Sequence, residues 1–222
     1  ANCWLDGPLR QQLAQACEAL SLARLTWDGE VIAMRAPPVQ RFGDAPVTPP
    51  PGAFLQATRH GEAALLEAVR DAVGEAEVVA DLFAGCGTFA LPLAQQARVH
   101  AVEGDAEMIA ALEGGWRRAK GAKPLTAETR DLFRRPLLPD ELAKIDAVVL
   151  DPPRAGAEAQ VAEIIRAEVP RVAYVSCNPV SFARDVQNMV AAGYRLDWVQ
   201  VVDQFRWSSH VELAACLTLP ES

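Results

Sequence analysis

The spacing of hydrophobic residues changes repeatedly along the chain. From residue 59 onward, apolar runs typical of strands alternate with amphipathic segments typical of helices. The pattern predicts helices over residues 61–73, 88–96, 106–119, 158–168 and 180–192. It predicts strands over residues 78–83, 99–103, 125–129, 145–150 and 172–176, followed by two more over 196–202 and 210–219. The chain therefore reads as an α/β fold.

Continuous apolar strands joined by helices are typical of a parallel sheet that is covered on both faces. The last two predicted strands have no crossover helix between them, so the final strand, 210–219, should run antiparallel. A Rossmann-like parallel sheet that ends with an antiparallel strand resembles the architecture of class I methyltransferases, on the analogy of the fold alone.

The first fifty residues follow a different pattern. Residues 8–24 have apolar positions at helical spacing, and residues 25–34 read as a hairpin with Asp28-Gly29 at its turn. Residues 36–52 contain six prolines, which favours an irregular linker. We therefore expect a small N-terminal appendage over residues 1–50 and one large domain over residues 51–222.

Composition and charge narrow the possible functions. Half of the residues are hydrophobic, yet no apolar run approaches the roughly 20 residues of a membrane span. With no charged-then-apolar leader at the start, we expect no membrane partner and a cytoplasmic location. The five cysteines lack C-x-x-C spacing, which favours free thiols over a metal site or a disulfide framework. The net charge of −8 opposes broad nucleic-acid binding, so any such affinity belongs to a local groove or lies partly outside this chain.

Residues 81–88 predict a ligand-binding turn, because they follow a strand at the edge where open α/β sheets bind ligands. Gly85 and Gly87 allow the backbone to turn tightly and to approach a ligand closely. Glu103 ends the next strand and could accept hydrogen bonds from two ribose hydroxyls, while Asp131 could contact an adenine amino group. The sequence has no phosphate-binding P-loop, so S-adenosylmethionine fits better than ATP. A strand-to-helix turn without a ligand is the alternative.

Three reactive side chains stand at the ends of predicted strands. Cys177 follows one strand and precedes Pro179, which predicts a position near a helix N-terminus and a lowered thiol pKa. Asp151 ends the neighbouring strand and begins an Asp-Pro-Pro segment. Because the final strand should run antiparallel, Glu212 at its start is expected to lie near Cys177. The pattern supplies a thiol nucleophile and a carboxylate base at one edge of the sheet.

At these residues the chain resembles the RNA uracil-C5 methyltransferase family, whose members make 5-methyluridine in transfer and ribosomal RNA. The matching segments, in the family's order, are Phe54-Leu55-Gln56, Asp81-Leu82-Phe83-Ala84-Gly85-Cys86-Gly87-Thr88-Phe89, Val102-Glu103, Asp151-Pro152-Pro153-Arg154-Ala155-Gly156, Ser176-Cys177-Asn178-Pro179 and His210-Val211-Glu212. The resemblance implies a cofactor site for S-adenosylmethionine lined by Gln56, Phe83, Thr88, Glu103 and Asp151. It also implies Cys177 as the nucleophile and Glu212 as the base.

The chain departs from the family pattern in places. Thr88 stands where the family often has Asn, and Thr58 stands where it usually has Asn two residues after Gln56. The family's N-terminal nucleic-acid-binding barrel and its iron–sulfur cysteines have no counterpart in this sequence, and residues 1–50 look like the remnant of a middle domain.

The resemblance implies a covalent mechanism, because C5 of uracil is too weak a nucleophile to take a methyl group directly. The Cys177 thiolate adds to C6, C5 displaces the methyl group from the sulfonium, and Glu212 removes the C5 proton before the thiol leaves. The target base must leave its stack to expose C6. The expected reaction is methylation of a uridine in structured RNA, with rRNA favoured over tRNA.

Two other hypotheses remain open at this point. Asp-Pro-Pro also resembles the motif of amino-group methyltransferases, which would not need Cys177; however, those proteins have an aromatic residue where Arg154 stands, which favours carbon methylation. The other alternative is a non-catalytic module that binds S-adenosylmethionine or RNA.

Overall fold

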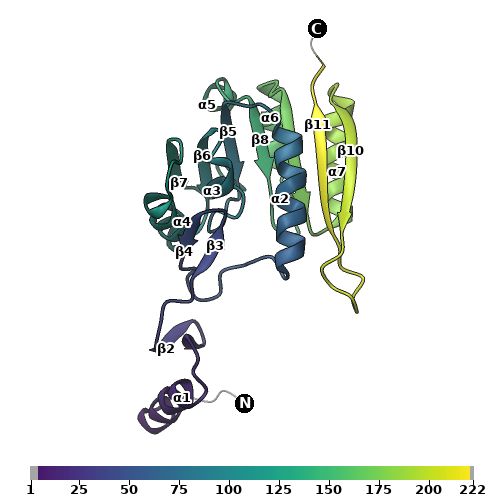
Figure 1. The fold of residues 1–222 in the computed structure, drawn as a ribbon. Coiled ribbons are helices and arrows are strands. Elements are labelled where there is room, and N and C mark those ends of the chain that lie inside the picture. Colours follow the sequence, from purple (N-terminus) through teal and green to yellow (C-terminus); the bar gives the residue numbers. More distant parts are fainter. Residues whose placement is uncertain (1–4, 221–222) are drawn as a thin grey trace.

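One seven-stranded sheet forms the centre of the molecule in the computed structural model, which describes residues 5–220 (Figure 1). Its strands are β5 Val78–Leu82, β6 Arg98–Glu103, β7 Leu125–Thr129, β8 Ala147–Leu150, β9 Arg171–Ser176, β10 Arg195–Val202 and β11 Glu212–Thr218. Their order across the sheet is β10-β11-β9-β8-β5-β6-β7. The apolar runs of the sequence predict all seven strands to within two residues at either end.

The final strand runs antiparallel, as the sequence predicts. β5, β6, β7, β8 and β9 pair in parallel, whereas β11 lies between β9 and β10 and pairs antiparallel with both. Glu212 is opposite Val202 at the end of β10, and Leu213 is opposite Ser176 at the end of β9. The start of β11 and the carboxyl ends of the parallel strands therefore share one edge of the sheet.

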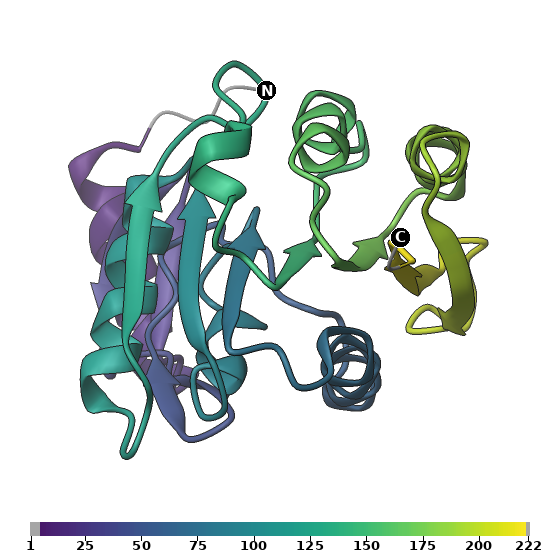
Figure 2. The ribbon, with the colours of Figure 1, turned by 90° about the horizontal axis from the view of Figure 1, so that it is seen from above.

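Helices cover both faces of this sheet. They are α2 Arg59–Val73, α3 Ala90–Leu93, α4 Ala106–Arg118, α5 Pro139–Leu142, α6 Glu158–Arg166 and α7 Pro179–Ala191. Figure 2 shows α6 and α7 on one face of the sheet and α2 on the other. The side chains form two buried cores, one with α2, α3 and α4 and one with α5, α6 and α7. This topology is the Rossmann-like α/β sheet expected from the sequence.

The N-terminal helix and hairpin form as predicted and lie apart from the main sheet, below it in the view of Figure 1. The helix is α1 Gly7–Ala19, and the hairpin consists of β1 Arg24–Trp27 and β2 Glu30–Met34, with Asp28 and Gly29 both at positive φ in the turn. Arg24 ties this unit to the following segment, because its Nη1 donates to the carbonyl of Pro49 at 2.7 Å.

The prediction of an irregular linker over residues 36–52 is wrong in its middle. A second hairpin, β3 Gln40–Phe42 and β4 Ala45–Val47, forms there and packs on α4. Phe42 and Val47 are buried in the main core, and Gly115 of α4 makes room for Val47, whose Cγ2 lies 2.5 Å from where a Cβ would stand. The number of prolines favoured a linker, but most of them flank the two short strands rather than interrupt them, so the hairpin can form.

Two helices differ from the prediction. α3 covers only four residues, whereas the sequence pattern favours a helix over 88–96. Pro92 lacks the N–H that would bond to the carbonyl of Thr88, and Gln95 and Gln96 donate three residues back instead of four. The short helix α5 was not expected; it begins with Pro139 at its first turn. Among the described residues, no helix is long and apolar enough to cross a bilayer.

Candidate functional site

A cavity of about 810 Å³ opens at the carboxyl edge of the sheet. All eight residues that the sequence singles out line this cavity: Gln56, Phe83, Thr88, Glu103, Asp131, Asp151, Cys177 and Glu212. They come from the segment before α2, from the ends of β5, β6, β7, β8 and β9, and from the start of β11. Folding thus brings together residues that are up to 156 positions apart in the chain.

The turn after β5 shapes one wall of the cavity. Gly85 has φ +55° and a Cβ there would meet nothing within 4 Å, so its backbone faces open space. Gly87 has φ +93°, and a Cβ there would lie 2.8 Å from Leu91. Glu103 fixes the turn, because its Oε2 accepts from the backbone N–H of Gly85 at 3.0 Å. The turn is therefore held open towards a ligand.

Asp81 is a polar residue of β5 for which the sequence analysis proposed no role. It is completely buried, and neither carboxylate oxygen has a hydrogen-bond partner among the described residues. Burial, followed by the negative charge of Asp151, raises the pKa of Asp81 well above its usual range, and the nearby backbone N–H of Ala90 offsets little of this rise. An ionisable residue inside an apolar strand was the signal in the sequence that could have identified it.

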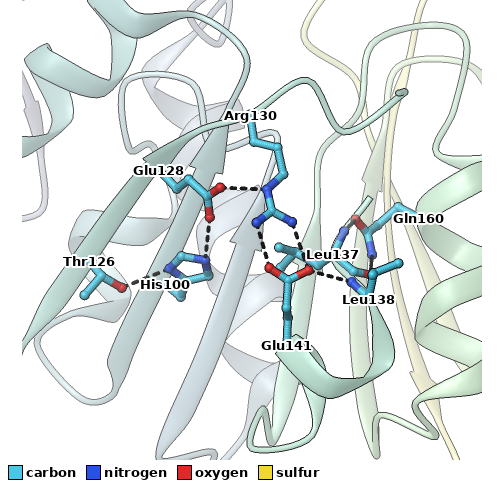
Figure 3. A network of polar contacts seen from close by, with 8 residues as sticks. All are labelled: His100, Thr126, Glu128, Arg130, Leu137, Leu138, Glu141 and Gln160. Atoms are coloured by element: carbon cyan, nitrogen blue, oxygen red, sulfur yellow. Dashed lines mark hydrogen bonds and ion pairs between the residues drawn. The ribbon is translucent and has the colours of Figure 1, made fainter. Parts of the chain in front are cut away.

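The wall beyond β7 is stabilised by a polar network centred on Arg130 (Figure 3). Arg130 donates from Nε to Glu128 at 2.7 Å and from both Nη atoms to Glu141 at 3.0 and 2.6 Å. The hydrogen bond with Arg130, assisted by the backbone N–H of Leu138, lowers the pKa of Glu141 to about 2. This network ties the end of β7 to α5 and holds the segment that carries Asp131.

Asp131 itself stands in a turn at the rim of the cavity and is exposed. Its Oδ1 accepts from the backbone N–H groups of Phe133 and Arg134, at 3.0 and 3.3 Å. The ring of Phe133 packs against that of Phe83, with centroids 5.4 Å apart. Phe133 was not expected at the site, and it adds a flat apolar wall next to Asp131.

The predicted catalytic residues meet where β8, β9 and β11 lie side by side. Cys177 follows β9 directly and is partly exposed, whereas Glu212 begins β11 and is only 4% exposed. The cavity is lined by both residues and by Asp151 at the end of β8. Burial, then Glu212 and Glu103, raise the pKa of Asp151 to about 7, and burial raises the pKa of Glu212.

The expected lowering of the Cys177 pKa is wrong for this state of the protein. Burial, then the negative charges of Glu212 and Asp151, raise the pKa of the thiol, and Arg154 opposes them only in part. Cys177 does lie just before the N-terminus of α7, where Asn178 is the N-cap. Burial of the thiol, together with the two carboxylates contributed by neighbouring strands, therefore outweighs the helix dipole.

Arg154 links the loop after β8 to the other catalytic elements. Its carbonyl accepts from Asn178 Nδ2 at 2.8 Å, and its Nη1 lies 3.4 Å from Nδ1 of His210. His210 precedes β11 rather than beginning it, and its ring faces that of Phe205 across 6.3 Å. These contacts hold the loop before β11 against the Asp-Pro-Pro-Arg segment.

The charges in the cavity suit a cationic nucleoside ligand. Its lining includes four carboxylates, those of Glu103, Asp131, Asp151 and Glu212. It also includes two guanidinium groups, those of Arg130 and Arg154, and Arg130 is already paired with Glu128 and Glu141. S-adenosylmethionine carries a sulfonium and an ammonium group, whereas a nucleotide would bring phosphates to this acidic wall. The lining therefore fits S-adenosylmethionine. No cluster of three or more potential metal ligands occurs within residues 5–220.

The fold and the position of this cavity match those of class I methyltransferases, and sequence comparison narrows the group of relatives. The family model described as tRNA (Uracil-5-)-methyltransferase matches residues 126–219. The chain is thus related to the RNA uracil-C5 methyltransferases, which confirms the resemblance in its motifs.

Individual relatives agree with this relationship. An uncharacterised RNA methyltransferase of Rhizobium meliloti is 54% identical over 88% of this chain and 47% of its own length. The 23S rRNA (uracil(1939)-C(5))-methyltransferase RlmD of Halomonas elongata is 42% identical over 65% of this chain and 30% of its own length. The chain spans about half the length of curated relatives that it matches, such as those of Rhizobium meliloti and Brucella suis.

Solved structures support the fold and the cofactor. The Pyrococcus abyssi tRNA (uracil-54, C5)-methyltransferase, in complex with S-adenosyl-L-homocysteine, has a TM-score of 0.70 and 28% identity over 81% of this chain and 44% of that chain. The TYW2 protein of M. jannaschii, in complex with AdoMet, has a TM-score of 0.59 and 16% identity over 90% of this chain and 95% of that chain, and it supports the fold alone. These comparisons support S-adenosylmethionine as the cofactor, as the sequence predicts.

Proposed function

We propose that this protein transfers a methyl group from S-adenosylmethionine to C5 of a uridine in structured RNA, through a covalent bond between Cys177 and C6. The observation that carries the proposal is the placement of Cys177 and Glu212 at the paired ends of β9 and β11, on the cavity that the cofactor residues also line. A ribosomal RNA is favoured as the substrate, because the relative of Halomonas elongata that acts on 23S rRNA is 42% identical.

The cofactor site takes its residues from four strand ends and the segment before α2. Glu103 is suited to the ribose hydroxyls, since a carboxylate only accepts hydrogen bonds, and Asp131 is suited to the adenine amino group for the same reason. Gln56, Phe83, Thr88 and Asp151 line the remainder of the site. S-Adenosylmethionine, when bound, supplies an electrophilic methyl group on its sulfonium.

The residues of this chain perform the remaining chemistry. Cys177, as a thiolate, forms a bond to C6 of the uracil, and the electron pair of the C5–C6 double bond becomes available at C5. C5 then takes the methyl group, and the sulfonium sulfur keeps the bonding pair of the broken bond. Glu212 accepts the proton from C5, the double bond re-forms, and the thiolate leaves. The raised pKa of Glu212 makes this carboxylate a stronger base than an exposed one.

We infer that the catalytic unit consists of residues 51–222 together with the hairpin β3–β4 that packs into its core, and that residues 1–35 are part of a region that contacts the RNA. The RNA must present its uridine outside the base stack, because the nucleophile and the base line a cavity rather than a surface. The acidic net charge of −8 is compatible with this role when RNA contacts are confined to one face.

The experiment that tests the proposal is the release of tritium from rRNA fragments labelled at uracil C5, with S-adenosylmethionine present. We expect the wild-type protein to release tritium and Cys177→Ala to release none. Glu212→Gln should stall after methyl transfer and leave a protein–RNA adduct that survives denaturing electrophoresis, because the C5 proton cannot be removed.

The alternatives give different results in the same assay. Methyl transfer that persists in Cys177→Ala without tritium release would support methylation of an exocyclic amine and overturn the covalent mechanism. Binding of S-adenosylhomocysteine by a wild-type protein that methylates neither rRNA nor tRNA fragments would instead support a non-catalytic module.

A further inference from the structure

Gln204 is a buried amide that contacts Gln56, a residue lining the cavity, and no motif of the chain includes it. It follows β10 and is 8% exposed. Its Nε2 donates to Oε1 of Gln56 at 2.8 Å, and its Oε1 accepts from the backbone N–H of Thr58 at 3.1 Å. Gly61 in α2 leaves space for it, because a Cβ there would lie 2.3 Å from Cδ of Gln204. The side chain is therefore enclosed and bonded at both ends.

The direction of these hydrogen bonds follows from the donors that are available. A backbone N–H can only donate, so the oxygen of the Gln204 amide must face Thr58. The NH₂ group of Gln204 must then face Gln56, which has to present its own oxygen in return. Gln56 itself lines the cavity. Because Gln204 engages its oxygen, the NH₂ group of Gln56 is left to donate to a ligand.

We propose that Gln204 is a positioning residue that fixes the amide of Gln56 as a hydrogen-bond donor to the methionine carboxylate of the cofactor. The carboxylate is the anionic acceptor of S-adenosylmethionine, and hydrogen bonds to a charged acceptor are the stronger ones, so it is the best partner for a fixed donor. The inference rests on the placement of Gln56 in the cofactor site under the proposed function.

The local structure explains why the backbone of Thr58 is available for this purpose. Thr58 is the N-cap of α2, and its Oγ1 accepts from the backbone N–H of Gly61 at 3.0 Å. Its own N–H precedes the helix and has no intrahelical acceptor. Gln204 supplies that acceptor from a position 146 residues later in the chain. One side chain thereby joins the start of α2 to the end of β10.

The test reverses the hydrogen-bond direction while preserving the shape. In Gln204→Glu at pH 8, a carboxylate still accepts from Thr58 but can no longer donate to Gln56, so the Gln56 amide must turn its NH₂ group away from the ligand. We expect the Kd for S-adenosylhomocysteine, which has the carboxylate, to rise about tenfold. The Kd for 5′-methylthioadenosine, which lacks the amino-acid end, should change less than about twofold.

Two further variants complete the experiment. Gln200→Glu adds the same charge at an exposed position of β10 and should leave both dissociation constants unchanged. Gln204→Met removes both hydrogen bonds without adding a charge, and it should weaken only the binding of S-adenosylhomocysteine. Equal losses for the two ligands would show a merely structural role and overturn the inference, as would an unchanged Kd for S-adenosylhomocysteine in Gln204→Glu. A wild-type protein that binds neither ligand would instead contradict the cofactor site itself.

Discussion

At the scale of single residues, the thiol of Cys177 has a raised pKa, whereas the proposed mechanism needs its thiolate. Burial is the main cause of the raised pKa, Glu212 and Asp151 add to it, and Arg154 opposes it. In the free protein, less than half of the Cys177 thiol should therefore be thiolate at the pH where an ordinary thiol is half ionised. The cationic cofactor would counteract the two carboxylates, so its binding is expected to activate the nucleophile.

The charges around Cys177 predict that two substitutions shift the pH profile of its alkylation in opposite directions. Arg154→Ala removes the charge that lowers the pKa of Cys177 and should move the alkylation profile to higher pH; Asp151→Asn should move it to lower pH. The measurement is the rate at which iodoacetamide modifies the Cys177 peptide, followed by mass spectrometry between pH 7 and 10. A shift in the same direction for both variants would contradict the electrostatic explanation.

At the scale of elements, the connection between β7 and α5 depends on the ion pair of Glu141 with Arg130 (Figure 3). Because the folded protein holds the pKa of Glu141 at about 2, below the ordinary value, the pair stabilises the fold above the ordinary pKa and this stabilisation is lost as the pH falls towards 2. Glu141→Gln should lower the free energy of unfolding by no more than about 1 kcal/mol at pH 7, because the pair is partly exposed.

That difference should shrink between pH 4.5 and about 2, which urea denaturation at pH 7 and pH 3 would reveal. Asp140→Asn, in the same short helix but outside the network drawn in Figure 3, is the matched control. A difference that is equally large at both pH values would show that Glu141 acts through packing and not through its charge.

The loop between β10 and β11 carries a second prediction at this scale. Trp207 is 98% exposed there, between two cavity residues of the same loop, Phe205 and His210. An exposed indole beside a site for an unstacked base is suited to stack on an RNA base, an interaction worth about 1–3 kcal/mol. Trp207→Ala should raise the KM for RNA about tenfold and leave the Kd for S-adenosylhomocysteine unchanged, whereas Trp207→Phe should retain most of the affinity. Equal KM values for all three proteins would exclude the contact.

At the scale of the whole molecule, the sequence predicts those features of the fold and of the site that depend on the local pattern of residues. The strands, the antiparallel β11 and the meeting of Cys177 with Glu212 follow from periodicity and from one missing crossover helix. The contact of Gln56 with Gln204 spans 148 positions between two residues of a type that is usually exposed, so no local pattern reveals it. The pKa of Cys177 was predicted in the wrong direction because the sequence shows the local helix terminus but neither the burial of the thiol nor the carboxylates of other strands.

The second hairpin leads to a prediction about which part of the N-terminal region the molecule needs. None of the residues of α1, β1 and β2 belongs to either core of the main sheet, whereas Phe42 and Val47 are buried in one of them. A protein without residues 1–35 should therefore keep its Tm within about 3 °C and still bind S-adenosylhomocysteine. Removing residues 1–50 should lower the Tm by about 10 °C or prevent folding, since losing a buried Phe alone costs about 3–5 kcal/mol.

The same pair of deletions separates folding from RNA recognition. If residues 1–35 contact only the RNA, their removal should raise the KM for RNA while the cofactor affinity stays constant, because the cavity is lined by residues 54–212. Phe42→Ala in the full chain is the matched control; it should lower the Tm without a selective effect on RNA. A large loss of Tm on removal of residues 1–35 would mean that α1 and the first hairpin stabilise the sheet through more than the bond between Arg24 and Pro49.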